Sequence, residues 1–185
     1  MIGCRPLTDA EIELVSQSFA GRFALRDRAL FVLGIYSGFR ISELLSLKAK
    51  DVVQHGELVA RVTVQRKSMK GKSQSRSVVL HPKAREALSP WLATLADDDP
   101  EGYLFRSRKG KNRSISRVQA YTILRDAFNA NHLSGRLATH SMRKTFANRA
   151  YENSGRDLLR TAKALGHKSV NSTISYLSFK SEEID

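Results

Sequence analysis

The sequence predicts a mainly α-helical α+β domain in which a small antiparallel β-hairpin interrupts a series of amphipathic helices. Three observations support this fold class. Apolar residues recur at helical spacing through most of the chain, the spacing changes to alternation within residues 57–80, and glycines or capping residues separate the helical segments. With 185 residues and no internal repeat, the chain is expected to form one domain over residues 1–185.

Three helices are predicted before residue 50. Thr8 and Glu11 match a capping box, so the first helix should begin at Thr8 and run to about Ala20. The second should span 24–37 with Gly38 as its C-terminal cap, and a short third should span 42–47. The residues of the second helix at buried-face spacing are Leu25, Ala29, Phe31, Val32, Ile35 and Tyr36.

A β-hairpin and further helices follow. Residues 57–64 alternate between apolar and polar side chains and predict one strand, 76–80 predict a second, and a polar turn centred on Gly71 joins them. Residues 103–105 are either a short strand or an extended link. Helices are expected at 82–95, 116–130, 141–152, 157–165 and 169–177. The apolar contacts of the second of these are expected from Val118, Tyr121, Ile123, Leu124, Ala127 and Phe128.

Net charge is the most unusual feature of the composition. The chain has 31 Lys and Arg against 18 Asp and Glu, a net charge of +13 and a pI near 10.2. Such a surface favours a polyanion as partner, because binding phosphates releases counterions, and an anionic membrane surface is the alternative. The sequence has no long apolar run and no apolar signal core, so we expect a cytoplasmic, nucleoid-associated protein with no membrane partner.

Cysteine and histidine usage predicts no metal and no cofactor. Cys4 is the only cysteine, which leaves no disulfide framework and no thiolate zinc site. The five histidines lack close ligand spacing, and no carboxylate cluster accompanies them. A metal-dependent nuclease is therefore the least favoured function.

Residues 139–177 contain the strongest functional candidates. His140 and Arg143 are three apart on a predicted helix and so share one face. His167 follows a glycine at a predicted helix end, and Tyr176 lies on a short polar segment near the C-terminus. Phosphoryl transfer to the tyrosine is the hypothesis that these residue types suggest.

Three sequence boxes give the chain a family resemblance. It resembles the tyrosine recombinases (phage integrase family) in their first arginine box at SGFRISELLSLKAKDV, their HxxR box at THSMRKTFAN and their LGH box at LGHKSVNSTISYL. Order and spacing agree from about residue 24 to 177. The resemblance implies an integrase-like DNA breaking and rejoining fold, and a site-specific DNA recombinase or integrase that acts through a covalent 3′-phosphotyrosine.

The resemblance implies a role for each residue that matches a box. Arg40 and Arg143 would bind the non-bridging oxygens of a scissile phosphate, because guanidinium groups donate bidentate hydrogen bonds and stabilise the charge of the transition state. Tyr176 would attack phosphorus. His140 or His167 would accept the tyrosine proton or hydrogen-bond the phosphate.

Glu43 and Lys70 complete the expected catalytic set. Glu43 lies three residues after Arg40 and would orient an arginine or histidine, although an exposed helix acid is the alternative. Lys70, on the hairpin turn, would protonate the leaving 5′ oxygen, with Lys67 and Lys72 as alternatives.

Double-stranded DNA is the expected partner, together with other recombinase protomers in a tetrameric synapse. The hairpin and the loop after residue 105 are rich in basic residues and are expected to follow the phosphate backbone. The predicted DNA-binding residues are Arg66, Lys67, Lys72, Arg76, Arg108, Lys109, Lys111 and Arg113.

The chain also differs from the family pattern. An N-terminal core-binding domain, usual in the family, is expected to be absent, so the chain would be one catalytic domain. The position of Tyr176, with nine residues after it, is expected to be the least secure part of the site without DNA or a neighbouring protomer. The alternative functions are a type IB topoisomerase-like enzyme and a non-recombining DNA-binding accessory or regulatory protein.

Overall fold

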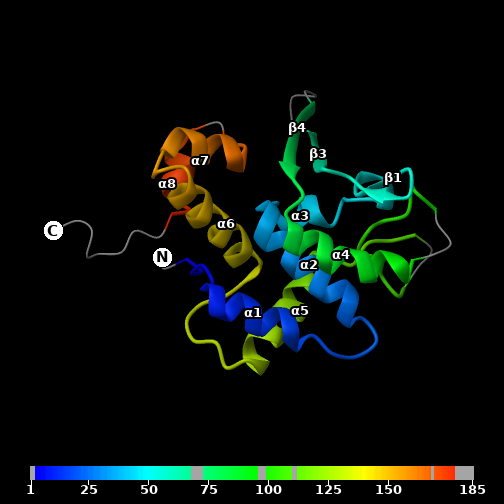
Figure 1. Cartoon of the computed structure of the whole chain (residues 1–185). Coiled ribbons are helices and arrows are strands. Elements are labelled where there is room, and N and C mark those ends of the chain that lie inside the picture. The colour runs from blue at the N-terminus through cyan, green and yellow to red at the C-terminus, as the bar shows by residue number, and fades with distance from the viewer. Residues whose placement is uncertain (1–2, 68–72, 96–98, 110–111, 168, 178–185) are drawn as a thin grey trace.

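The computed structural model describes residues 3–67, 73–95, 99–109, 112–167 and 169–177 (Figure 1). Within them, the helices are α1 (Asp9–Ser18), α2 (Ala24–Ser37), α3 (Ile41–Leu44), the 3-10 helix η1 (Ala49–Asp51), α4 (Pro82–Ala93), α5 (Arg117–Ala130), α6 (Thr139–Asn153), α7 (Leu158–Leu165) and α8 (Val170–Ile174). The strands are β1 (Val53–Gln54), β2 (Glu57–Leu58), β3 (Arg61–Lys67) and β4 (Ser73–Val79). None of the helices in these ranges is long and apolar enough to cross a membrane.

The predicted start of α1 and the predicted end of α2 follow from local capping, whereas α1 ends at Ser18, two residues before the predicted end. The Thr8 hydroxyl accepts the backbone N–H of Glu11 at 3.2 Å, and the Glu11 carboxylate accepts that of Thr8 at 2.9 Å. Gly38 ends α2 in the left-handed conformation, with a φ of 59°. Most of the predicted inner face of α2 is buried, but Leu25 is 38% exposed, so its predicted burial is wrong.

The predicted hairpin is present, but the long first strand divides in two. β3 pairs antiparallel with β4, and Val64 lies opposite Arg76. Residues 57 and 58 instead pair with β1, a strand that the sequence pattern did not predict. Apolar alternation runs through both segments, so it did not reveal the break at Val59 and Ala60 between β2 and β3.

Two further helices frame the core. In α4, Trp91 is buried and its indole N–H donates to the Leu104 carbonyl at 2.9 Å, which ties this helix to the extended link at 103–105. On α5, the predicted apolar contacts of Val118 and Tyr121 are wrong, because these side chains are 74% and 42% exposed. Helical spacing alone did not show which side of this helix lacks a partner.

The buried apolar residues form two clusters. The main cluster contains residues from helices α1, α2, α3, α4 and α5 and from the strands, and it extends to Met142 on α6. A small second cluster contains Ala147 of α6, Leu165 of α7 and Leu177 after α8. Figure 1 accordingly shows α7 and α8 against α6, to one side of the main body. Arg40 and Glu43 therefore lie on the main body, whereas His167 and Tyr176 lie next to α7 and α8.

Candidate active site

Helix α6 carries two candidate residues in its first turns. The helix begins at Thr139, two residues before the predicted start, so His140 is helical from the outset. Arg143 is only 1% exposed, whereas His140 is exposed. Both approach Tyr176: the centroids of the His140 and Tyr176 rings lie 6.4 Å apart, and Cζ of Arg143 lies 5.4 Å from the Tyr176 centroid. The spacing on α6 therefore directs both side chains to one site.

The Arg143 guanidinium joins segments that are distant in sequence. Its Nη1 donates to the carbonyl of Gly38, at the end of α2, and its Nη2 donates to the carbonyl of Leu165, at the end of α7, over 2.9 Å. Nη2 also lies 2.9 Å from Nε2 of His167. Carbonyls at helix ends lack intrahelical partners, so a buried guanidinium satisfies them while they compensate its lost hydration.

His167 follows Gly166, which ends α7 in the left-handed conformation with a φ of 63°. The second ring nitrogen of the histidine, Nδ1, lies 3.0 Å from Oγ1 of the buried Thr173 on α8. Both ring nitrogens therefore have protein partners. Thr173 was not predicted as a site residue, because an additional threonine in a polar segment gives no distinguishing signal.

Tyr176 lies in a turn just beyond α8, rather than within the predicted helix, because α8 ends at Ile174. Its ring centroid is 5.3 Å from that of His167, and its side chain is partly buried in the second cluster. The phenol Oη has no hydrogen-bond partner in the described part of the chain. The tyrosine thus lies among Arg143, His140 and His167 in the single chain without DNA. This is the condition in which we expected the position of Tyr176 to be the least secure part of the site.

Arg40 is held by the carboxylate of Glu43. The Arg40 backbone N–H donates to Oε2 of Glu43 at 2.7 Å, and its Nη1 donates to Oε1 at 3.3 Å. The arginine side chain is 37% exposed, while that of Glu43 is 8% exposed. The carboxylate is therefore directed into the protein and the guanidinium remains accessible, which suits an orienting carboxylate and a phosphate-binding arginine.

Arg76 does not lie where a DNA-contacting residue would be expected. Its residue exposure is 6%, and its guanidinium donates to the carbonyls of Ser37 and Ala164, each at 2.7 Å. The guanidinium also lies 4.9 Å from the Phe39 ring centroid. The predicted DNA contact of Arg76 is therefore wrong, because the side chain is enclosed by protein groups that already use its donors.

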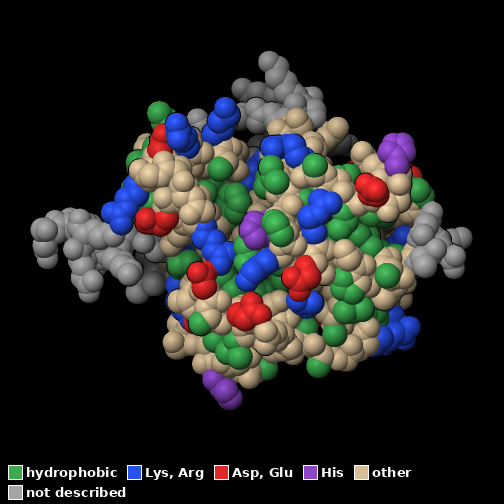
Figure 2. Space-filling view, in the orientation of Figure 1, with side chains coloured by type: hydrophobic (Ala, Val, Ile, Leu, Met, Phe, Trp, Pro, Cys, Tyr) green, Lys and Arg blue, Asp and Glu red, His purple; other side chains and the backbone are tan. Residues whose placement is uncertain are grey.

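The other predicted DNA-binding residues divide between described and undescribed parts of the chain. Arg66 and Lys67 belong to β3, whereas Lys72 and Lys111 lie outside the described residues, as does Lys70, the predicted general acid. Figure 2 shows one face of the molecule, on which acidic side chains are interspersed among Lys and Arg, so the described residues form no continuous basic surface there. The exposed members of the predicted set are Arg108, Lys109 and Arg113.

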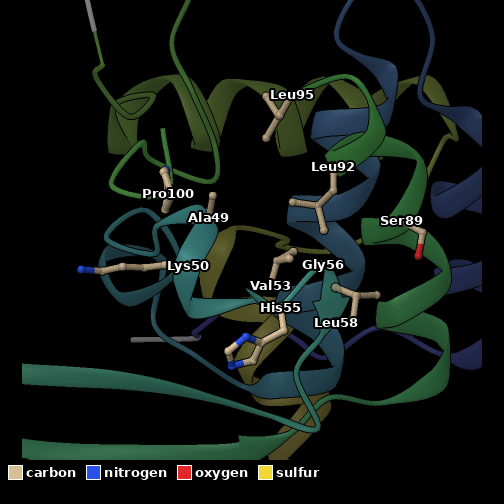
Figure 3. Close-up of a pocket in the computed structure, with 10 residues that line it drawn as sticks. All are labelled: Ala49, Lys50, Val53, His55, Gly56, Leu58, Ser89, Leu92, Leu95 and Pro100. Carbon is tan, nitrogen blue, oxygen red and sulfur yellow. The ribbon is translucent and has the colours of Figure 1, made fainter. Parts of the chain in front are cut away.

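An open cavity of about 550 Å³ lies elsewhere, between the β1–β2 pair and the end of α4 (Figure 3). Its lining includes Val53, His55, Leu58 and Leu92, and none of the candidate catalytic residues that the structure describes lines it. No group of three or more His, Cys, Asp or Glu side chains that could hold a metal ion occurs among the described residues. The candidate chemistry therefore belongs to the arginine, histidine and tyrosine cluster rather than to this cavity.

The fold, together with the approach of the HxxR and LGH boxes to Tyr176, defines a tyrosine recombinase catalytic domain. The chain belongs to the phage integrase family, whose sequence profile matches residues 6–183.

Two relatives illustrate the sequence similarity. The probable integrase/recombinase YoeC of Bacillus subtilis (strain 168) is 32% identical over 152 residues, which are 82% of this chain and 77% of YoeC. Tyrosine recombinase XerC of Pseudomonas fluorescens is 31% identical over 172 residues, which are 91% of this chain and 54% of that protein. The chain thus spans about half the length of the XerC relatives that it matches.

Solved structures have the same fold. XerA recombinase is similar with a TM-score of 0.78 at 25% identity, over 97% of this chain and 62% of XerA. XerH recombinase, in a post-cleavage complex with a palindromic difH substrate, is similar with a TM-score of 0.74 at 24% identity, over 97% of this chain and 50% of XerH. The mainly helical fold with small antiparallel sheets that the sequence predicted is therefore confirmed.

Proposed function

We propose that this chain is the catalytic domain of a site-specific DNA recombinase that breaks and rejoins double-stranded DNA through a 3′-phosphotyrosine. One observation carries the proposal: the centroid of the Tyr176 ring lies 5.4 Å from Cζ of Arg143 and 5.3 Å from the centroid of the His167 ring, and Arg143 also donates to the carbonyl of Gly38, two residues before Arg40. The phenol of Tyr176 lies beside a guanidinium, and its Oη has no hydrogen-bond partner in the described residues. This arrangement suits a nucleophile that attacks an anionic phosphodiester.

The proposed reaction is a transesterification. The Oη of Tyr176 forms a bond to phosphorus as the bond from phosphorus to the 5′ oxygen breaks, so the number of phosphoester bonds is unchanged. Arg40 and Arg143 bind the non-bridging oxygens and stabilise the added charge of the transition state, and the buried Arg143 exchanges part of its contacts with the Gly38 and Leu165 carbonyls for the phosphate. A 5′ hydroxyl then reverses the step and rejoins the strand, so no nucleotide cofactor is consumed.

The roles of the two histidines in proton transfer are assigned from whether their ring nitrogens already have protein partners. The ring nitrogens of His167 lie against Arg143 and Thr173, whereas those of the exposed His140 have no hydrogen-bond partner in the described ranges. His140 is therefore our choice for the base that accepts the tyrosine proton, and His167 for a residue that orients Arg143. Lys70 is the proposed acid that protonates the leaving 5′ oxygen.

The proposed enzyme needs no metal, because two guanidinium groups supply the positive charge that a metal ion would otherwise bring to the phosphate. Duplex DNA is the proposed substrate, by analogy with XerH, which is described as bound to its difH substrate. Partner protomers in a tetrameric synapse, and a nucleoid location in the cytoplasm, belong to the same proposal.

Covalent adduct formation tests the proposal. The purified chain is incubated with a pool of nicked duplexes of randomised sequence, in which cleavage releases a short strand and so prevents religation. A denaturing gel should reveal a protein–DNA adduct at the 3′ phosphate, and sequencing of the trapped DNA should give a preferred site. EDTA should leave the adduct yield unchanged if no metal takes part.

Two tyrosine variants give the matched comparison. Tyr176→Phe should form no adduct, whereas Tyr151→Phe, which changes another tyrosine of the same apolar cluster, should form as much as the parent protein. Adduct formation by Tyr176→Phe would refute the nucleophile. Relaxation of supercoiled DNA without site preference would instead support a topoisomerase-like activity.

A further inference from the structure

Arg76, on β4, joins the ends of two helices that belong to different parts of the fold. Its Nη2 donates to the Ser37 carbonyl at 2.7 Å and its Nη1 to the Gly38 carbonyl at 3.2 Å, both at the end of α2. Nε and Nη2 donate to the Ala164 carbonyl, near the end of α7, at 3.0 and 2.7 Å. Carbonyls at helix C-termini favour a cation, so one guanidinium stabilises both ends.

Arg143 joins the same two helix ends from α6. It shares the Gly38 carbonyl with Arg76, and it donates to Leu165, the residue after the Ala164 acceptor of Arg76. Two buried arginines from different elements therefore connect α2 to α7 in parallel. Arg143 also contacts the Tyr176 ring, whereas the aromatic contacts described for Arg76 are with Phe39 and Phe146.

This connection matters because α2 and α7 place their buried apolar residues in different clusters, which are linked through α6. The α7–α8 unit contributes its buried apolar residues to the second cluster, which is separate from the main core that contains α2. Arg40 follows Gly38 by two residues, and His167 follows Leu165 by two. The distance between Arg40 on one side and His167 and Tyr176 on the other therefore depends on the polar bridges between the two helix ends as well as on α6, which packs on both α2 and α7.

We propose that Arg76 is a positioning residue, which holds the α7–α8 unit, with His167 and Tyr176, against the turn that carries Arg40. The inference rests on the proposed function of this site and adds to it a residue that touches neither DNA nor the reacting atoms. Arg76 also lies 3.9 Å from Oε2 of Glu43, the carboxylate that holds Arg40. A change at Arg76 thus alters the support of both halves of the site together.

Two substitutions and two measurements test the inference. Arg76→Met keeps an unbranched side chain about as long as the arginine chain up to Nε and removes every donor, and Arg76→Lys keeps the charge without donors that span both helix ends. At saturating nicked DNA, adduct formation by Arg76→Met should fall about 100-fold, because a displacement of about 1 Å costs that much. Its Kd for DNA should change less than about twofold, and Arg76→Lys should lie between it and the parent.

Hydrogen–deuterium exchange supplies a measurement that does not need activity. In Arg76→Met, amides of residues 158–177 should exchange faster than in the parent, while those of α2 and α4 should be unchanged. The control is Arg125→Met, which removes an exposed arginine of α5 outside the predicted DNA-binding set and should leave the saturated rate and the exchange unchanged.

Other results would overturn the inference. Unchanged exchange at 158–177 in both Arg76 variants would show that Arg76 does not hold this unit, and a raised Kd with an unchanged saturated rate would make it a DNA contact. If Arg76→Met does not fold, the folded Arg76→Lys decides by the same two measurements. If the parent forms no adduct, the proposed function fails, and the exchange comparison still decides whether Arg76 positions α7–α8.

Discussion

The 2.9 Å contact between Nη2 of Arg143 and Nε2 of His167 fixes the tautomer of the histidine. A guanidinium can only donate, so Nε2 is the acceptor and the proton of the neutral imidazole is on Nδ1. Nδ1–H then donates to Oγ1 of Thr173 over 3.0 Å. A threonine of α8 thereby orients the ring that contacts the buried arginine beside Tyr176.

Removing the Thr173 hydroxyl should therefore impair catalysis more than folding. Thr173→Val keeps the shape of the side chain and removes the acceptor of the Nδ1–H, so the ring loses one of its two fixed contacts. We expect the rate of adduct formation to fall about tenfold, which equals about 1.4 kcal/mol, in the range of one hydrogen bond. Single-turnover cleavage measures the rate, and 15N NMR of His167 reports the tautomer.

Thr161→Val is the matched control for this prediction. Thr161 is also 0% exposed, but its hydroxyl donates to the Asp157 carbonyl at 2.7 Å within the first turn of α7. This variant should lose stability and keep its rate of adduct formation per folded molecule. Equal rates in Thr173→Val and the parent would contradict the orienting role of Thr173.

Gly38 combines two requirements that a side chain cannot meet. Its φ of 59° is costly for other residues, and an added Cβ would overlap the ring of Phe146. Gly56 has a φ of 79° but nothing within 4 Å of an added Cβ. In urea unfolding, Gly56→Ala should lose about 1 kcal/mol from backbone strain alone, and Gly38→Ala should lose about 1–3 kcal/mol more from the overlap. Equal losses would show that Phe146 moves aside without cost.

Much of the fold could be predicted because its signals are local. The bounds of α2 depend on apolar spacing and a glycine at its end, and the start of α1 depends on the Thr8–Glu11 capping box. The apolar positions at 57–64 were also recognised, but their division into two strands depends on pairing with β1, which a pattern within one segment does not contain.

Fewer of the contacts in the candidate site could be predicted from local sequence patterns. His140 and Arg143 share a helix face, so their convergence follows from spacing, but only the family resemblance brought Arg40 to the same site. Arg76 had the appearance of a surface arginine in a basic hairpin. Its acceptors lie 38 and 88 residues away at Gly38 and Ala164, and only the packed structure determines such contacts.

Salt dependence should separate surface arginines from buried ones. Each phosphate contact adds about 0.9 to the magnitude of the slope of log Kd against log salt concentration. Replacing exposed Arg108 or Arg113 by Gln should reduce the slope by about one contact, whereas Arg76→Met should leave the slope unchanged, because its guanidinium is enclosed. Retention of labelled duplex DNA at several salt concentrations measures the slope. If Arg76→Met reduced the slope as much as the exposed variants do, Arg76 would be a DNA contact after all.

The choice of Lys70 as general acid can be tested through the leaving group. A substrate whose 5′-bridging oxygen is replaced by sulfur releases a thiolate, which needs no proton because a thiol has a pKa far below that of an alcohol. Lys70→Ala should cut ordinary DNA about 100-fold more slowly than the parent and should recover most of that loss on the sulfur substrate. Recovery by Lys67→Ala or Lys72→Ala instead would move the role to that lysine.

The ion pair between Arg5 and Glu11 should make stability depend on pH. Two hydrogen bonds of 2.6 and 2.8 Å from the guanidinium lower the pKa of Glu11 to about 2 from its ordinary value of 4.5. A lowered pKa in the folded state contributes stability that is complete above the unfolded pKa and is lost as the pH falls toward the folded pKa. The Tm advantage of the parent over Glu11→Gln should therefore be largest near neutral pH and should shrink between about pH 5 and 2. Glu13→Gln, an exposed change on the same helix, is the control, and an advantage over Glu11→Gln that does not vary with pH would contradict the assignment.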